Sequence, residues 1–167
     1  MKLTGAIIII YACWMLGVDL YKSNIKRLNF TKGLFSCAEF LKTEIVYDCV
    51  FLEDSIIRSV PFSGDAASFI ECIGTRLEEK GISTEAAFEK AKPDLIKNVS
   101  SEVYLLTKEL FFQLGEKDCE SQEKLISGYL KKLEPIIEKQ DGFCRKECVM
   151  FKKTGAIVGI GIAVLLI

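Results

Sequence analysis

The chain has 167 residues, of which 50% are hydrophobic and 27% are charged, and its formal net charge at pH 7 is −1. This length allows one domain with appendages, and the absence of a basic cluster argues against nucleic acid as a partner. The sequence has no histidine, so the commonest metal ligand and general base are missing. It also lacks GxxxxGK[ST] and HExxH motifs. No catalytic site, metal or cofactor is therefore predicted.

The first predicted element is a membrane anchor over residues 1–20. Its core, residues 3–18, reads LTGAIIIIYACWMLGV and carries no charge; as a helix it reaches roughly 24–28 Å, enough for a thin bilayer. The alternatives are a cleaved signal peptide, since Lys2 precedes the apolar run, and a lipoprotein modified at Cys13. No small-x-small cleavage site follows the run, and Tyr11 is bulky for a lipoprotein signal, so an uncleaved anchor is favoured.

Residues 21–153 show helical periodicity with no paired strand runs, which predicts an all-α domain, a bundle of about six helices. Five of these helices are defined by apolar positions. In chain order they are Leu34, Ala38, Leu41 and Ile45; Phe51, Leu52 and Ile56; Ala66, Phe69, Ile70, Ile73 and Leu77; Val103, Leu106, Leu110 and Leu114; and Ile126, Tyr129, Leu130, Leu133 and Ile137. The remaining helix, the fourth in the chain, is expected after Ser83.

Capping residues, prolines and a glycine predict where these helices begin and end. Ser83 is expected to be the N-cap of the fourth helix, and Asp118 that of the sixth. Pro93 is expected to limit the fourth helix, because the residue before a proline is disfavoured in the helical region, and Gly115 is expected to end the fifth. Pro135 should kink or break the last helix, because it lacks a backbone N–H.

Residues 154–167, TGAIVGIGIAVLLI, predict a second membrane segment. As a helix they reach only about 21 Å, so a full crossing requires a start near residue 148 with the two intervening lysines snorkelling toward headgroups. A buried strand or core helix is the alternative. Gly155, Gly159 and Ala163 repeat at four-residue spacing and give a smooth face suited to packing against another membrane helix.

Basic residues beside the anchors predict the orientation. Lys22, Lys26 and Arg27 follow the first anchor, and five further Lys and Arg residues between 139 and 153 precede the second. The positive-inside rule therefore places the bundle in the cytoplasm and both termini outside it. The cysteines number seven and include no CxxC pair; unpaired thiols suit the same reducing compartment.

Two motifs lie between the anchors in a fixed order. The first, LKTEIVY, starts at Leu41 and is followed by LEDSI from Leu52; the second, LGxxDxxxQ, runs from Leu114 to Gln122. This ordered set between two apolar ends resembles the stage III sporulation protein AB family of endospore-forming bacteria, over essentially the whole chain.

The resemblance implies a non-enzymatic role in a multi-protein channel that joins the mother cell to the forespore, in the mother-cell membrane around the forespore. It implies a soluble domain similar to the cytoplasmic domains of the type II secretion platform protein. The implied partners are a cytoplasmic secretion-type ATPase, stage III sporulation protein AA, and other membrane components, with homo-oligomers also possible. The alternative is a membrane-tethered adaptor or sensor unrelated to secretion.

The resemblance also selects candidate site residues. Three are candidates for a partner interface: Glu44, Tyr47 and Gln122. Glu44 and Gln122 have no local backbone role, and for these two an intramolecular hydrogen bond is an equal alternative. Three more are expected to be structural, as a core residue, a helix stop and a helix cap: Leu114, Gly115 and Asp118.

Cysteine labelling in intact cells tests the orientation. A maleimide that cannot cross the membrane is expected to leave Cys72 and Cys119 unmodified, because both belong to the domain predicted to be cytoplasmic. A membrane-permeant maleimide is the control for thiol reactivity. Modification of either cysteine by the impermeant reagent would place the bundle on the other side.

Overall fold

The computed structural model describes the backbone of residues 2–47, 51–79, 82–114 and 119–166, and the side chains of 15, 18–19, 21–45, 51–79, 82–114 and 120–146. These described residues form helices and turns without any β-strand, which confirms the all-α class. The chain divides into two compact units, residues 1–25 with 139–167, and residues 26–138.

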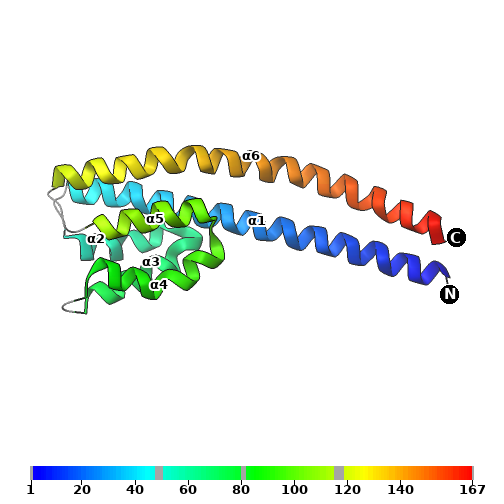
Figure 1. Cartoon of the computed structure of the whole chain (residues 1–167), viewed down its shortest axis with the longest axis horizontal. Helices are drawn as coiled ribbons and strands as arrows, with labels where there is room; N and C mark the ends of the chain where they lie inside the picture. The colour runs from blue at the N-terminus through cyan, green and yellow to red at the C-terminus, as the bar shows by residue number, and fades with distance from the viewer. Residues whose placement is uncertain (1, 48–50, 80–81, 115–118, 167) are drawn as a thin grey trace. The chain divides into compact units, whose positions relative to one another are not determined.

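Six α-helices and two short 3-10 helices are described (Figure 1). They are α1 (Lys2–Tyr47), α2 (Leu52–Ser59), η1 (Val60–Phe62), η2 (Gly64–Ala66), α3 (Ala67–Leu77), α4 (Thr84–Asn98), α5 (Ser101–Gln113) and α6 (Cys119–Leu166). Helices α1 and α6 each contribute residues to both units, whereas α2 to α5 belong to the 26–138 unit alone.

The two predicted anchors fall in the long helices. Residues 2–20 belong to α1 and residues 154–166 to α6, so the alternative of a C-terminal strand is excluded for that described backbone. Among the residues that the structure describes, no helix combines the length and the apolar composition needed to cross a bilayer. The predicted packing face of Gly155, Gly159 and Ala163 lies outside the residues whose surroundings are described.

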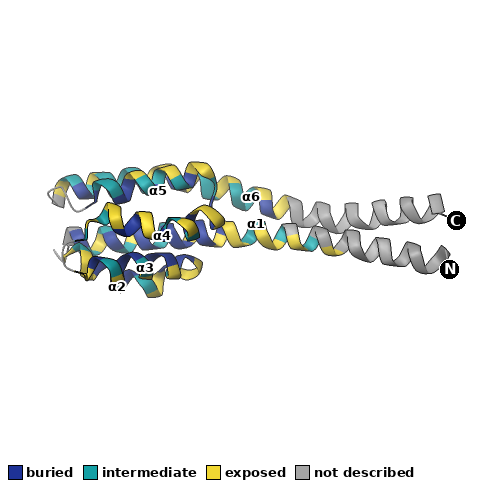
Figure 2. Cartoon of the chain, turned by 60° about the horizontal axis from the view of Figure 1, so that its bottom comes forward, coloured by how far each residue is buried: buried dark blue, intermediate teal, exposed yellow. Residues whose placement is uncertain are grey.

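Phenylalanine rings form the centre of the 26–138 unit. The ring of Phe69 on α3 lies 6.2 Å from that of Phe30 on α1, centroid to centroid. It also lies 6.0 Å from Phe88 on α4 and 6.0 Å from Phe111 on α5, edge-to-face in both cases, an arrangement that aromatic rings prefer. None of the four side chains is more than 2% exposed. Four helices therefore share one core, as the buried inner faces in Figure 2 show.

The predicted apolar faces are buried where their spacing placed them. Every position predicted for α1 and most of those for the other helices belong to one continuous core, and Leu106, Leu130 and Ile137 pack half-buried against it. The fully buried members include Leu34, Ala38, Leu41 and Ile45 of α1; Phe69, Ile70, Ile73 and Leu77 of α3; Val103 and Leu110 of α5; and Ile126, Tyr129 and Leu133 of α6.

The prediction that Pro93 limits the fourth helix was wrong, and so was that of a break at Pro135; a kink at Pro135 stays a prediction. Helix α4 continues five residues past Pro93 to Asn98, and α6 runs unbroken through Pro135. Each proline is exposed, as are Glu89 and Lys131, the residues four positions earlier. Their carbonyls lose an intrahelical donor, but water can supply one on an exposed face. Packing on the opposite face of each helix therefore outweighs the local cost of a proline in the helix interior.

The other predicted helix ends concern Ser83, Gly115 and Asp118. The Ser83 hydroxyl accepts a hydrogen bond from the Ala86 amide at 3.3 Å, which confirms it as the N-cap of α4. Helix α5 ends at Gln113 and α6 begins at Cys119. The predicted stop at Gly115 and cap at Asp118 lie outside the described residues.

Gly33 lets α1 lie directly against the turn between η1 and η2. A Cβ at this position would overlap the carbonyl oxygen of Ser63, a backbone atom that cannot turn aside as a flexible side chain can. The Ser63 hydroxyl is buried and donates to the carbonyl of Ser59 at 2.8 Å, so this turn is held in place. A larger residue at position 33 would force α1 away from it.

Alanine at two helical glycines tests this close approach. Gly33→Ala is expected to destabilise the fold by about 1–3 kcal/mol through overpacking. Gly128→Ala is the matched control, because a Cβ there meets no described atom within 4 Å, and helix propensity should stabilise it by up to about 1 kcal/mol. Unfolding of the full chain in detergent micelles, followed by circular dichroism, measures both. Equal gains in stability would contradict the close packing at Gly33.

Candidate functional site

One end of the 26–138 unit gathers the described residues of the two sequence motifs, which are 41–47 with 52–56 and 114 with 119–122; we call it the loop end (Figure 1). Helix α1 ends and α2 begins there, and α5 ends and α6 begins beside them. The amine of Lys42 on α1 lies 3.9 Å from the carboxylate of Glu123 on α6. Two residues 81 positions apart in the sequence are thus neighbours.

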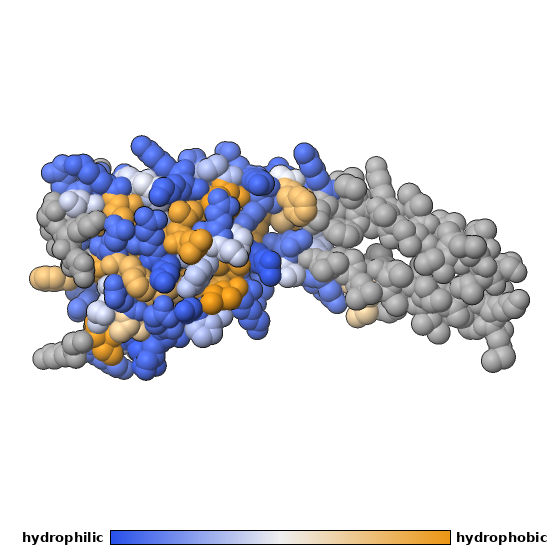
Figure 3. Space-filling view, in the orientation of Figure 1, coloured by the Kyte–Doolittle hydropathy of each residue, from blue (hydrophilic) through white to orange (hydrophobic). Residues whose placement is uncertain are grey.

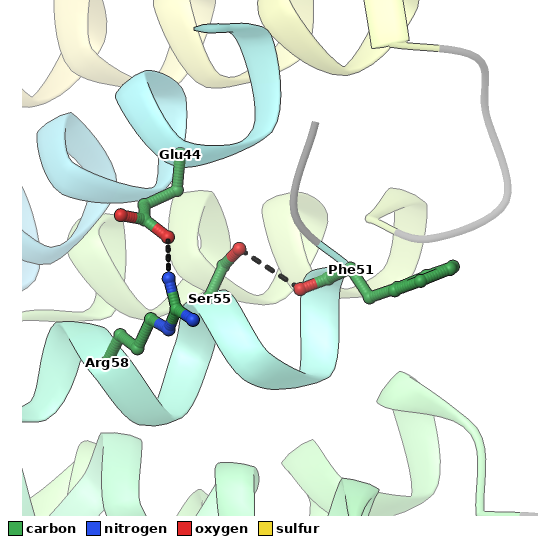
Figure 4. A network of polar contacts seen from close by, with 4 residues as sticks. All are labelled: Glu44, Phe51, Ser55 and Arg58. Carbon is green, nitrogen blue, oxygen red and sulfur yellow. Dashed lines mark hydrogen bonds and ion pairs between the residues drawn. The ribbon is translucent and has the colours of Figure 1, made fainter. Parts of the chain in front are cut away.

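Glu44 is paired within the chain. Its carboxylate accepts a hydrogen bond from Nη1 of Arg58 at 3.3 Å, which joins the end of α1 to α2. The Glu44 side chain is only 14% exposed, whereas that of Arg58 is 60% exposed. The carboxylate therefore orients the guanidinium, and the guanidinium is the part of this pair that solvent or a partner can reach (Figure 4).

Phe51, just before α2, is the most exposed of the large hydrophobic residues described, at 82%. Its carbonyl oxygen accepts both the backbone amide and the hydroxyl of Ser55, each at 3.0 Å. The ring points away from these contacts (Figure 4). Periodicity had assigned Phe51 to the apolar face of the second helix; its actual position, preceding the first turn, directs it outward instead.

The remaining motif residues have differing surroundings. Gln122, in the first turn of α6, is 9% exposed and makes an interaction within the chain. Leu114 is fully buried, and its carbonyl accepts the hydroxyl of Thr84 at 3.2 Å. The side chain of Tyr47, like the segment from Gly115 to Asp118, lies outside the description. Sequence reasoning missed Arg58, because no local spacing connects it to Glu44, fourteen positions earlier.

A buried polar cluster lies deeper in the same unit. The Cys37 thiol is 3.2 Å from the Ser59 hydroxyl, and the Tyr129 hydroxyl is 3.1 Å from that of Thr107. Burial raises the pKa of Cys37, and hydrogen bonds with Ser59 and Ser63 oppose that rise. Burial likewise raises the pKa of Tyr129. Both groups stay protonated and hydrogen-bonded, so the cluster fits a structural role better than a reactive one.

The described residues contain no group of three or more Cys, Asp or Glu side chains placed to hold a metal ion. Among the described cysteines, Cys37 and Cys72 are free thiols. The loop end thus offers an exposed aromatic ring and an exposed guanidinium held by a carboxylate. Side chains of these types are common at the centres of protein interfaces.

Comparisons with known proteins show the family and the fold of the chain. A family described as "Stage III sporulation protein AB" matches residues 2–167. A solved structure, "Stage III sporulation protein AB (SpoIIIAB)", is similar with a TM-score of 0.60 and 20% sequence identity, over 71% of this chain and 96% of that one. At that identity the likeness shows the fold. No curated protein sequence matches the chain. Since the family match covers nearly every residue and the fold is shared, the chain belongs to the stage III sporulation protein AB family, which implies a role in sporulation.

Proposed function

We propose that this protein is a non-enzymatic platform component of the channel complex between mother cell and forespore. In this proposal it couples a cytoplasmic secretion-type ATPase, stage III sporulation protein AA, to the membrane components of the complex. Family membership supports the sporulation role, and the loop end supplies the surface on which the ATPase would dock.

The observation that carries the proposal is the exposure of Phe51 and Arg58 at the two ends of α2, with the Arg58 guanidinium paired to Glu44. Phe51 is 82% exposed and the Arg58 side chain 60% exposed. An aromatic ring exposed to water gains free energy on burial against a partner. A guanidinium already oriented by Glu44 loses less rotamer entropy when it binds a carboxylate.

Helix α2 holds these side chains on a rigid base. Ser55, Ile56 and Ser59 are fully buried on its inner side. At Gly74 of α3 a Cβ would lie 2.8 Å from the Ile57 side chain, so α3 fits closely against α2. A short helix fixed along its inner face presents its outer residues in one geometry, and such preorganisation lowers the cost of binding.

The charge at the loop end is mixed rather than basic. Glu53 and Asp54 are exposed in the first turn of α2, where carboxylates interact favourably with the helix dipole. They follow Phe51 in the sequence, and Arg58 lies one turn beyond Asp54, in the last turn of α2. A partner surface with an apolar pocket, a carboxylate for Arg58 and basic residues at its edge would complement this pattern.

The proposal includes a membrane location. The apolar sequences at residues 3–18 and 154–167 would anchor the chain in the mother-cell membrane around the forespore. The basic residues flanking them would hold the 26–138 unit on the cytoplasmic side, where a cytoplasmic ATPase can reach it.

Substitutions at the loop end test the docking surface. Phe51→Asp and Arg58→Glu are each expected to weaken ATPase binding at least 10-fold, about 1.4 kcal/mol or more, since each removes a central contact. Ile96→Asp is the matched control, because Ile96 of α4 is also exposed, at 52%. The full chain in nanodiscs, titrated with purified ATPase, gives the affinities.

Two further variants examine the residues that the sequence selected. Glu44→Arg should also weaken binding, because it places a like charge beside Arg58, and Gln122→Arg should do so only if Gln122 contacts the partner. Wild-type affinity of both Phe51→Asp and Arg58→Glu for the ATPase, at a normal melting temperature, would exclude the loop end as the docking site. Absence of any binding by the wild-type chain at tens of micromolar protein would favour an adaptor unrelated to secretion.

A further inference from the structure

A second surface of the 26–138 unit, between α5 and α6, is hollowed. A groove of about 170 Å³ lies there. Its floor is apolar and includes Leu106, Leu125 and Gly128; its rim carries charged side chains, Glu109, Lys124 and Lys132. Leu125 and Leu106 are only half-buried, although both pack against the core. Apolar floor is thus open to solvent in the chain described.

A protruding side chain lies beside this groove. Leu105 of α5 is 62% exposed, and Glu109 on the groove rim follows it by four residues. Residues four apart lie on the same face of a helix, so Leu105 and the groove share one face. Figure 3 shows apolar side chains exposed among charged ones on the side that carries α5.

Gly128 has no packing role within the described chain. A Cβ there would meet nothing within 4 Å, in contrast to the tight surroundings of Gly33. A glycine in a helix interior makes the helix less stable than an alanine does. The presence of glycine at position 128 therefore points to a contact made with something outside the described chain. Glycine permits the close approach of another backbone or side chain, and Gly128 lies in the groove floor.

The charges around the groove cancel. Lys132 lies 4.0 Å from Glu109 across α5 and α6, and Lys124 lies 2.7 Å from Glu120 along α6. With Glu120 counted beside the groove, two positive and two negative side chains leave this surface without net charge. Such a face gives no preference for a strongly charged partner, but it offers both signs to a surface that also carries both.

We propose that this α5–α6 face, made of Leu105, Glu109, Lys124, Gly128 and Lys132, pairs with the same face of a second copy of the chain. A two-fold contact joins a surface to itself, so it requires a protrusion and a recess on one face. Leu105 of each copy enters the groove of the other above Gly128. Lysines of one copy then meet carboxylates of its partner, and water leaves the apolar floor.

Photo-crosslinking of the purified full chain in detergent micelles, with no ATPase present, tests this contact. Leu105 is replaced by p-benzoylphenylalanine, with Ile96 replaced in the same way as the exposed control on α4. Ultraviolet light is expected to give a covalent dimer from the Leu105 variant at least 10-fold more efficiently than from the Ile96 variant. Mass spectrometry should locate the crosslink in α6 between residues 121 and 132.

Filling the groove gives the second arm. Gly128→Leu, combined with the crosslinker at 105, is expected to lower the dimer yield at least 10-fold. Its melting temperature should be no lower than that of the parent, because the added side chain has open space. A yield at 105 no greater than at 96, a crosslink outside α6, or a yield unaffected by Gly128→Leu would each overturn the proposal. Because the ATPase is absent, none of these results depends on the proposed function.

Discussion

The packing of the Phe69 ring against phenylalanines from three other helices organises the 26–138 unit. Phe30, Phe88 and Phe111 each contact it, so α1, α3, α4 and α5 are positioned around one side chain. Aromatic pairs add specific geometry to the free energy of burial. With these helices placed, α2 is confined between α1 and α3, and its outer residues acquire a defined direction. The display of Phe51 and Arg58 is a consequence of that confinement.

The fold class and most of the core could be predicted from the sequence, because burial repeats with the helical period. Leu34, Ala38, Leu41 and Ile45 are one example: their spacing alone predicts a single buried face. Pro93 and Pro135 show where such reasoning fails. A proline changes local preferences by an amount that packing of the opposite face can exceed, and the sequence does not show whether the proline faces water.

The candidate site could be selected from the sequence only as a set of residues, not as a place in the fold. Glu44 and Gln122 were selected by motif, and the structure shows that each is largely buried and makes an interaction within the chain. What periodicity could not supply was the direction of individual side chains. Phe51 has the large apolar side chain of a core residue, yet it precedes the first turn of α2 and points outward. Arg58 depends on a pairing with Glu44 across two helices, which only the tertiary structure brings together.

The Cys37 thiol has a consequence of its own. It is 2% exposed, is hydrogen-bonded to Ser59, and has a raised pKa because it is buried. Thiol reagents attack the solvent-exposed thiolate, so they reach this sulfur only when α1 separates from the turn after α2. The rate of its modification then reports the free energy of that opening, in the way that amide exchange reports local unfolding. The modification of Cys37 can therefore be used to follow the opening of the bundle without any engineered label.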